Sequence, residues 1–167
     1  MKVTISRKDE SGRVTSGALS QVLPGWVAGE RWLFVSPHDD DIAMAGALLV
    51  TAAVEAGIQV SCRIATDGRM GYTAREQREN IVAIRKEETL ECFRTLGVED
   101  VSWYDFPDAD LYRHAGRRRA TDEESPDVRE GHTGLQNSLT WELRALRPHR
   151  VVVLSGNDYH PDHKLLH

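Results

Sequence analysis

Residues 32–41 read Trp32-Leu33-Phe34-Val35-Ser36-Pro37-His38-Asp39-Asp40-Asp41, an apolar segment that runs directly into a group of acidic residues. Four successive apolar residues followed by turn-forming residues are typical of a buried strand, which we predict over 32–36. The next apolar run ends before Gly57, a common helix-terminating residue, and this pattern favours a helix over about 42–56. A strand that leads through a polar turn into a helix is the repeating unit of α/β proteins.

The same alternation continues toward the C-terminus. Further strands are predicted over 58–66, 101–104 and 151–154, and further helices over about 75–96 and over the stretch whose one face carries Leu135, Leu139, Leu143 and Leu146. This alternation predicts an α/β fold with a Rossmann-like, mostly parallel sheet and helices on both faces. Ligands bind beyond the carboxyl ends of the strands in such sheets. We therefore expect four strand-end loops to converge on one crevice, those at 36–41, 66–73, 105–111 and 155–163.

Two segments lack a clear period. Residues 1–30 mix charged residues with Gly and Ser and are interpreted as a lead-in segment, which leaves residues 31–167 as one domain. Residues 112–133 combine the arginines of 117–119 with an acidic stretch. A solvated, mobile loop is expected there, with a lid as the alternative.

The composition bounds the class of protein. With 167 residues, the chain has the size of one domain that buries about 70% of the surface exposed in its unfolded form. The formal net charge of −5 offers no broad positive field, which argues against nucleic acid as a partner. The longest apolar stretch, 42–54, is too short to span a bilayer, so no membrane anchor is expected.

The sequence also favours a compartment. The first ten residues lack the continuous apolar core of a secretory signal. The two cysteines, Cys62 and Cys92, lie far apart and show no CxxC spacing. We therefore expect a reduced, cytoplasmic protein, and the sequence leaves a homo-oligomer open.

The first group of polar residues, 38–41, places an imidazole beside three carboxylates. Like charges at this density repel one another unless a cation or a helix N-terminus stabilises them. Capping of the following helix by Asp40 or Asp41 is the simpler explanation. Capping accounts for one carboxylate, however, and not for three and a histidine.

A second group, residues 157–163, reads Asn157-Asp158-Tyr159-His160-Pro161-Asp162-His163 and follows another predicted strand. Neutral imidazole and carboxylate are usual ligands of Zn²⁺, and a hydrolytic zinc site uses three protein ligands and one open position. Both groups fall at strand ends of one predicted sheet. We therefore interpret them as two halves of one metal site.

These motifs resemble those of the PIG-L/LmbE-like zinc-dependent N-acetylglucosaminyl deacetylase family. Residues 37–41 are similar to its HPDDE-type motif, and residues 160–163 are similar to its HxDH motif. The intervening segments 66–71, 85–98 and 106–108 also resemble signatures of the family. The resemblance runs from about residue 32 to the end of the sequence.

The resemblance implies a zinc-dependent hydrolase that removes the N-acetyl group of a small-molecule amino-sugar or glycoconjugate. It implies a metal-ligand set of His38, Asp41 and His163. It further implies that Asp40 is the general base and that His160, held by Asp162, is the acid and oxyanion stabiliser. These roles suit the residue types, because zinc acidifies water and a carboxylate in reach can take the proton.

Four more residues are interpreted as substrate-binding on the same grounds: Asp67, Arg69, Arg85 and Asp108. Simpler explanations stay open for two of these assignments. Arg85 and Glu88 have the i,i+3 spacing of a solvated pair on a helix. Asp67-Gly68 is also an ordinary turn sequence.

Several positions depart from the family pattern. Asp39 stands where the motif usually has Pro, and its charge is expected either to raise the pKa of the base or to turn to solvent. Ile42 stands where Glu is frequent. Ala109 occupies the usual Gly of a PDG-like segment, so a different backbone path is expected near Asp108. The sequence ends four residues after His163, and we expect a shortened C-terminal part with a loosely held His163.

Two other functions compete with the deacetylase hypothesis. The acidic loop also suits a Mg²⁺- or Mn²⁺-dependent phosphoesterase, because hard cations prefer oxygen ligands. A non-catalytic metal- or sugar-binding remnant is the third hypothesis, and it predicts bound zinc without turnover.

Overall fold

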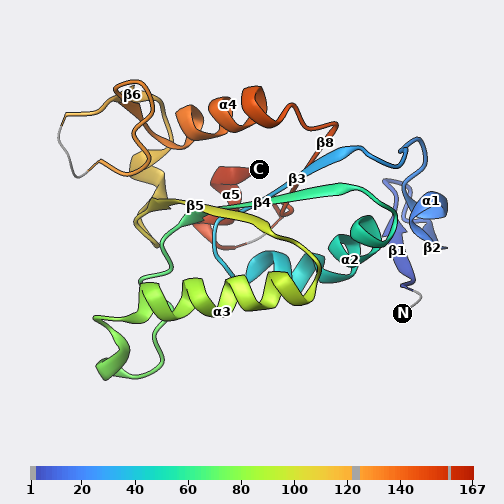
Figure 1. The fold of residues 1–167 in the computed structure, drawn as a ribbon, viewed down its shortest axis with the longest axis horizontal. Helices are drawn as coiled ribbons and strands as arrows, with labels where there is room; N and C mark the ends of the chain where they lie inside the picture. Colours follow the sequence, from blue (N-terminus) through green and yellow to red (C-terminus); the bar gives the residue numbers. More distant parts are fainter. Residues whose placement is uncertain (1–2, 122–124, 158) are drawn as a thin grey trace.

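A computed structural model describes residues 3–121, 125–157 and 159–167. Its centre is a sheet of four parallel strands in the order β5-β4-β3-β8 (Figure 1). The strands are β3 (Arg31–Ser36), β4 (Gln59–Thr66), β5 (Asp100–Phe106) and β8 (Arg150–Val153). The direction of winding reverses between β3 and β8. The carboxyl ends of these two strands therefore flank the switch point at which α/β sheets bind their ligands.

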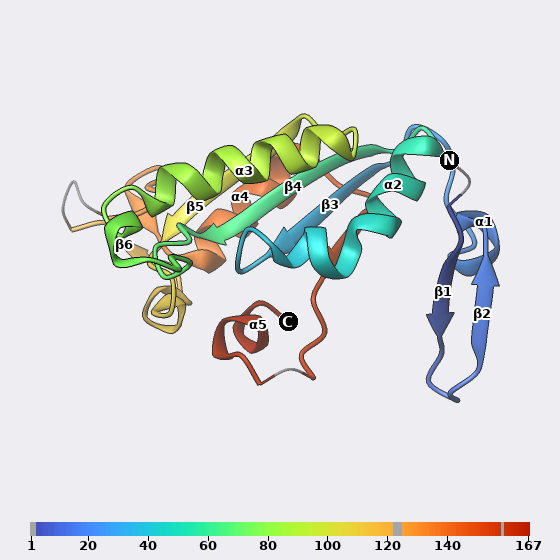
Figure 2. The same cartoon turned by 90° about the horizontal axis from the view of Figure 1, so that it is seen from below.

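Helices cover both faces of this sheet, as the alternation predicts (Figures 1 and 2). The helices are α2 (Ala47–Glu55), α3 (Ile81–Thr95), α4 (Leu135–Leu146) and α5 (Pro161–Leu166). Successive residues of β3 point to opposite faces. Phe34 packs in one cluster with Val50 of α2 and Phe93 of α3. Leu33 packs in a second cluster with Leu135 of α4. Burial of each such side chain stabilises the fold by roughly 1.5–3 kcal/mol.

The predicted strands and helices are present, with differences at helix starts. The helix expected over 42–56 begins as a π-helix, η1 (Ile42–Gly46), before α2 continues it. The helix expected over 75–96 is a 3₁₀ turn, η2 (Arg75–Gln77), followed by α3. The sequence carries no separate signal for either change, because η1 spans only five residues and η2 only three, too few to show a period of their own.

The lead-in segment is more regular than its sequence pattern indicates. Strands β1 (Ile5–Lys8) and β2 (Val14–Gly17) form an antiparallel hairpin, followed by the short helix α1 (Leu19–Val22). Leu19 is buried in the cluster between the sheet and α2. The segment is thus attached to the domain by a few apolar side chains.

The stretch 112–133 is partly ordered, and its residues 122–124 lie outside the described part. Helix η3 (Leu111–His114) leads to two short paired strands, β6 (Arg118–Arg119) and β7 (His132–Thr133). Arg129 bridges Asp127 and Glu142 of α4. Arg118 and Arg119 are exposed, as a solvated loop predicts, whereas Thr133 is buried.

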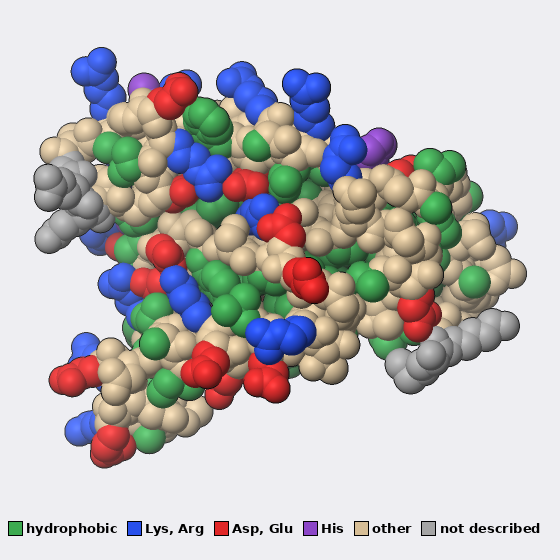
Figure 3. Space-filling view, viewed as in Figure 1, with side chains coloured by type: hydrophobic (Ala, Val, Ile, Leu, Met, Phe, Trp, Pro, Cys, Tyr) green, Lys and Arg blue, Asp and Glu red, His purple; other side chains and the backbone are tan. Residues whose placement is uncertain are grey.

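The surface mixes both signs of charge. Acidic and basic side chains are interspersed on the face in Figure 3, with Lys and Arg side chains projecting over α4. Among the described residues, none of the helices has the length and apolar character needed to cross a membrane.

Candidate metal centre

The turn after β3 has a fixed shape. The Ser36 hydroxyl donates to the carbonyl of His38 (2.8 Å), and the backbone N–H of His38 donates to Oδ2 of Asp41 (2.9 Å). The carbonyl of Pro37 accepts from the backbone N–H and the hydroxyl of Thr66 on β4. Asp41 occupies the N-cap position of η1 without a capping hydrogen bond from its side chain. The capping explanation therefore does not hold for Asp41.

The second histidine group lies on α5, directly beside this turn (Figure 2). His160 is the N-cap residue of α5, and Pro161 fills the first helical position, where a missing N–H does no harm. Leu166 is buried in the cluster that contains Leu33, and Leu165 packs against it. These contacts pack α5, the helix that carries His163, against the sheet.

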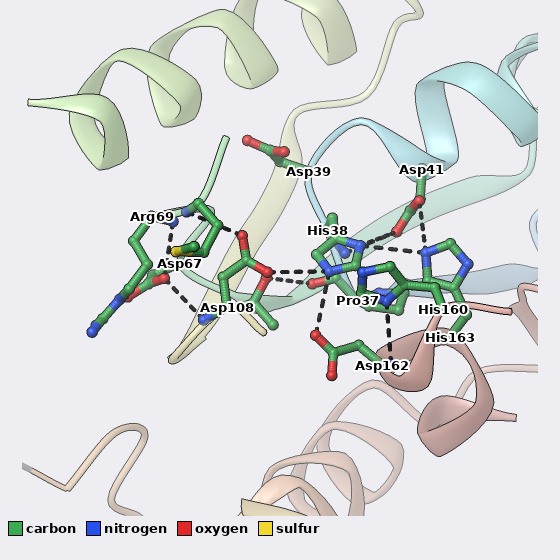
Figure 4. Close-up of polar contacts among 12 residues, drawn as sticks. Pro37, His38, Asp39, Asp41, Asp67, Arg69, Asp108, His160, Asp162 and His163 are labelled. Atoms are coloured by element: carbon green, nitrogen blue, oxygen red, sulfur yellow. Dashed lines mark hydrogen bonds and ion pairs between the residues drawn. The ribbon is translucent and has the colours of Figure 1, made fainter. Parts of the chain in front are cut away.

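Three residues from the two groups converge, with one carboxylate oxygen of Asp41 facing each histidine (Figure 4). Nδ1 of His38 lies 3.3 Å from Oδ2 of Asp41 and 3.3 Å from Nε2 of His163. Nε2 of His163 lies 3.2 Å from Oδ1 of Asp41. Ligands about 2.0–2.1 Å from a tetrahedral zinc ion are separated by about 3.3–3.4 Å. The spacing and the N₂O donor set therefore fit zinc.

The opposite edge of the His38 ring faces two carboxylates. Its Nε2 lies 3.3 Å from Oδ1 of Asp108 and 3.4 Å from Oδ2 of Asp162. The Asp162 side chain is fully buried, and within the described residues its two oxygens accept no hydrogen bond. A carboxylate behind a ligating histidine fixes the ring and raises its basicity. Asp108 is placed to accept from Nε2–H, with the Asp162 carboxylate close to the same nitrogen, so that Nδ1 faces Asp41 and His163.

These carboxylates dominate the electrostatics of His38. Burial alone would lower its pKa, but hydrogen bonds that the ring donates to Asp108 and Asp41, together with the charges of these carboxylates, raise the pKa to about 10. The same contacts outweigh burial for the two carboxyl groups and lower the pKa of Asp41 and of Asp108. A cation that binds to Nδ1 therefore competes with a proton.

His160 completes the group of three imidazoles. Its ring centroid lies 4.6 Å from that of His38, at an interplanar angle of 82°, and 4.9 Å from that of His163. The sequence-based assignment has the carboxylate of Asp162 holding His160. The structure differs, because Nδ1 of His160 accepts from the backbone N–H of Asp162 (3.3 Å), while the carboxylate faces His38. The start of a helix at Pro161 turns the Asp162 side chain inward.

An open cleft of about 280 Å³ lies beside these histidines. Small-molecule sites span roughly 300–1,000 Å³, so the cleft suits a small ligand or one residue of a larger one. All four strand-end loops contribute to it, which confirms the expected convergence. The lining consists of His38, Asp39, Asp40, Gly68, Met70, Gly71, Arg85, Asp108, Ala109 and His160.

The remaining predicted site residues divide into two groups. Asp108 and Arg85 line the cleft, whereas Asp67 and Arg69 are not among its lining residues. Arg69 Nε donates to Oδ2 of the buried Asp67 (2.7 Å), whose Oδ1 accepts from the backbone N–H of Asp108 (3.3 Å). Asp67 therefore supports the loop that carries Asp108.

The structure bears on two cleft positions that depart from the family pattern. Asp39 is neither exposed nor turned to solvent; it is buried and pairs with Arg85 of α3. Ala109 adopts a left-handed backbone conformation, with φ of +65°, that glycine takes without strain. The turn beside Asp108 therefore has a backbone conformation that favours glycine over alanine.

The match to a known family covers the whole of this site. A profile of the PIG-L family, described as GlcNAc-PI de-N-acetylase, matches residues 33–167. The chain belongs to the PIG-L family. Both histidine groups, the sheet and the cleft lie within the matched residues.

Individual PIG-L relatives are longer than this chain. Diacetylchitobiose deacetylase of Thermococcus kodakarensis is 34% identical over 83 residues, which are 49% of this chain and 31% of that protein. The structure of N,N'-diacetylchitobiose deacetylase from Pyrococcus horikoshii in complex with an inhibitor is similar, with a TM-score of 0.64 and 26% identity over 81% of this chain and 46% of that one. The structure of conserved protein TT1542 of Thermus thermophilus is also similar, with a TM-score of 0.58 and 27% identity. The match covers 81% of this chain and 51% of that one. The chain thus spans about half the length of these relatives, or less.

Proposed function

We propose that this chain is a zinc-dependent hydrolase that removes the N-acetyl group from an N-acetyl-amino-sugar or a glycoconjugate that carries one. The observation that carries the proposal is the convergence of His38 Nδ1, Asp41 and His163 Nε2 at separations of 3.2–3.3 Å. Membership of the PIG-L family and the similarity to two proteins named diacetylchitobiose deacetylase support the choice of reaction.

The metal would be held by His38, Asp41 and His163. When bound, zinc supplies a Lewis acid that polarises an amide carbonyl and lowers the pKa of water. The histidine-rich donor set favours zinc over Mg²⁺ or Mn²⁺, which prefer oxygen ligands.

Asp40 is the proposed general base. Its side chain is about half exposed and lines the cleft next to His38. A carboxylate in this place can accept the proton of the attacking water. Asp41, in contrast, faces both His38 and His163, so the base and ligand roles separate between Asp40 and Asp41.

His160 is the proposed acid and oxyanion stabiliser. Its Nδ1 accepts from the backbone N–H of Asp162, so the proton of the neutral ring resides on Nε2. This ring lines the cleft. The neutral ring can donate a hydrogen bond from Nε2–H to the developing oxyanion. In its imidazolium form it can give a proton to the leaving amine and return to the neutral ring, since an amide nitrogen departs as an amine only with a proton.

The test combines metal analysis with acetate release from a panel of N-acetyl-amino-sugars. One equivalent of zinc and turnover support the proposal. Turnover of phosphate esters with Mg²⁺ or Mn²⁺ would instead support the phosphoesterase, and bound zinc without hydrolysis of any panel member would support a binding remnant.

The proposed setting is the cytoplasm. Cys62 and Cys92 are both free thiols, in keeping with a reducing compartment. The proposed partner is the small-molecule substrate, and neither nucleic acid nor a membrane anchor is invoked.

A further inference from the structure

Asp39 and Arg85 form a two-point contact in the wall of the cleft. Nε of Arg85 donates to Oδ2 of Asp39 (2.8 Å), and its Nη2 contacts Oδ1 of the same carboxylate. The Asp39 side chain is 4% exposed, and that of Arg85 is 23% exposed. A fork of this kind fixes the plane of the guanidinium group, because both donors point in set directions.

The same guanidinium group reaches the proposed general base. Nη2 of Arg85 lies 3.3 Å from Oδ2 of Asp40, the residue next to Asp39 in sequence. The Asp39 side chain points away from the histidines toward α3, as Figure 4 shows. Arg85 thus contacts the buried Asp39 on one side and the half-exposed Asp40 on the other.

The loop after β4 closes over this pair. A Cβ atom at Gly71 would lie 3.1–3.2 Å from the Arg85 guanidinium group, and one at Gly68 would lie 3.3 Å from Oδ2 of Asp39. Both glycines therefore allow the backbone to approach the ion pair closely. The guanidinium group is confined between this loop and the turn after β3.

We propose that Asp39 is a positioning residue for Asp40, which acts by holding the Arg85 guanidinium group against the Asp40 carboxylate. A half-exposed carboxylate on its own samples several rotamers. Each unproductive rotamer lowers the fraction of protein molecules in which the carboxylate is positioned to take a proton. The contact with Arg85 restricts Asp40 to one side of the cleft. The proposal rests on the function proposed above for Asp40.

The kinetic test uses Asp39→Asn, which keeps the size of the side chain but weakens its hold on Arg85. We expect kcat for acetate release to fall about 10–100-fold, the range that a small misplacement of a catalytic group produces. KM and zinc content should stay within twofold of the parent values, because the Asp39 side chain is only 4% exposed and is paired with Arg85 rather than with a metal ligand. Arg85→Lys, which offers a point charge in place of a fork, should give a similar loss.

A matched control removes another carboxylate–arginine pair. Asp100→Asn breaks the contact of Asp100 with Arg63 (2.8 Å) at the amino end of β5, far from the cleft. Its kcat should equal that of the parent. The double variant Asp39→Asn/Arg85→Lys should be no slower than either single variant, because the two residues act as one unit.

A second readout is independent of turnover. We expect ¹⁵N NMR of the arginine side chains to show hindered rotation of the Arg85 guanidinium group in the parent and free rotation in Asp39→Asn. An unchanged Arg85 signal in Asp39→Asn, or a freed Arg85 with unchanged kcat, overturns the proposal. A parent protein that hydrolyses no substrate refutes the proposed function, and the NMR comparison then still decides whether Asp39 holds Arg85.

Discussion

Nε2 of His163 lies 3.3 Å from Nδ1 of His38, although the two residues are 125 positions apart in the sequence. Both nitrogens also face Asp41. Two imidazoles have little reason to direct nitrogens at one point in a protein core unless a proton or a cation is shared there. This relationship leads to the following predictions.

Removal of one ligand should abolish the metal site. We expect His163→Ala to weaken zinc binding by more than about 100-fold. Mutation of a residue that only hydrogen-bonds to a metal ligand already lowers metal affinity about 10–100-fold, and loss of the ligand itself should cost more. Competition with a chromophoric chelator measures the affinity. His132→Ala, a histidine of β7 outside the cluster, serves as the control and should bind zinc as the parent does. Equal affinities for all three proteins would show that His163 is not a ligand.

Asp40→Asn should keep zinc and lose turnover. The amide cannot accept a proton, and general bases contribute roughly 10²–10⁴-fold to rates. Acetate release and zinc content are measured on the same sample. Full activity would transfer the role of base to another carboxylate of the cleft, for which Asp108 is the next candidate because Asp39 is buried against Arg85.

Asp162→Asn should reduce zinc affinity by about 10–100-fold, because the neutral amide stabilises the His38 ring less well. The metal-free variant should be at least as stable as the metal-free parent, since a neutral group replaces a fully buried carboxylate that accepts no hydrogen bond from the described part of the chain. Thermal unfolding with and without chelator separates the two effects. A large loss of stability in the metal-free state would indicate a purely structural role.

Ala109→Gly should raise the free energy of unfolding by up to about 1 kcal/mol. The left-handed conformation costs alanine roughly 1–2 kcal/mol, which glycine does not incur. Glycine has the greater conformational entropy in the unfolded chain, and this offsets about 0.5–1 kcal/mol of that gain. Urea denaturation measures the change. Gly97→Ala, at a φ of +80°, is the inverse control and should destabilise the protein. A destabilised Ala109→Gly variant would rule out strain at this position.

The two cysteines should react at very different rates. Burial raises the pKa of the Cys62 thiol to about 12, so almost no thiolate forms at pH 8. A thiol-specific reagent should therefore modify Cys92 of α3 in the folded protein, and Cys62 only after unfolding. Mass spectrometry of the labelled peptides identifies the site, and rapid labelling of native Cys62 would contradict the buried position of β4.

The sequence predicts much of the fold because the apolar patterns of its strands and of its helices are distinct. The apolar run at 32–36 is strand-like, and Leu135, Leu139 and Leu146 mark one face of a helix, so the order of elements follows directly. Both histidine groups also stand out, since each follows a strand. The π turn of η1 and the hairpin in residues 1–30 leave no such trace in the apolar pattern.

Side-chain partners across the fold are harder to predict. Asp39 and Arg85 are separated by 46 positions, and no local rule selects that pair over the spacing of Arg85 with Glu88. Likewise, neighbours in sequence favour a contact of the Asp162 carboxylate with His160, but the turn of α5 directs it to His38. Such choices depend on how helices dock on the sheet, which is set by the whole core.

The proposed metal ligands lie on the turn after β3 and on α5, and this placement has a mechanical consequence. An ion held by His38 and His163 would cross-link two segments that are 125 positions apart. In the chain-entropy treatment of covalent links, closing a loop of roughly this size stabilises a fold by about 4–5 kcal/mol. Zinc would then act on this chain much as a disulfide does, and its removal should release α5 to proteases before the sheet itself unfolds.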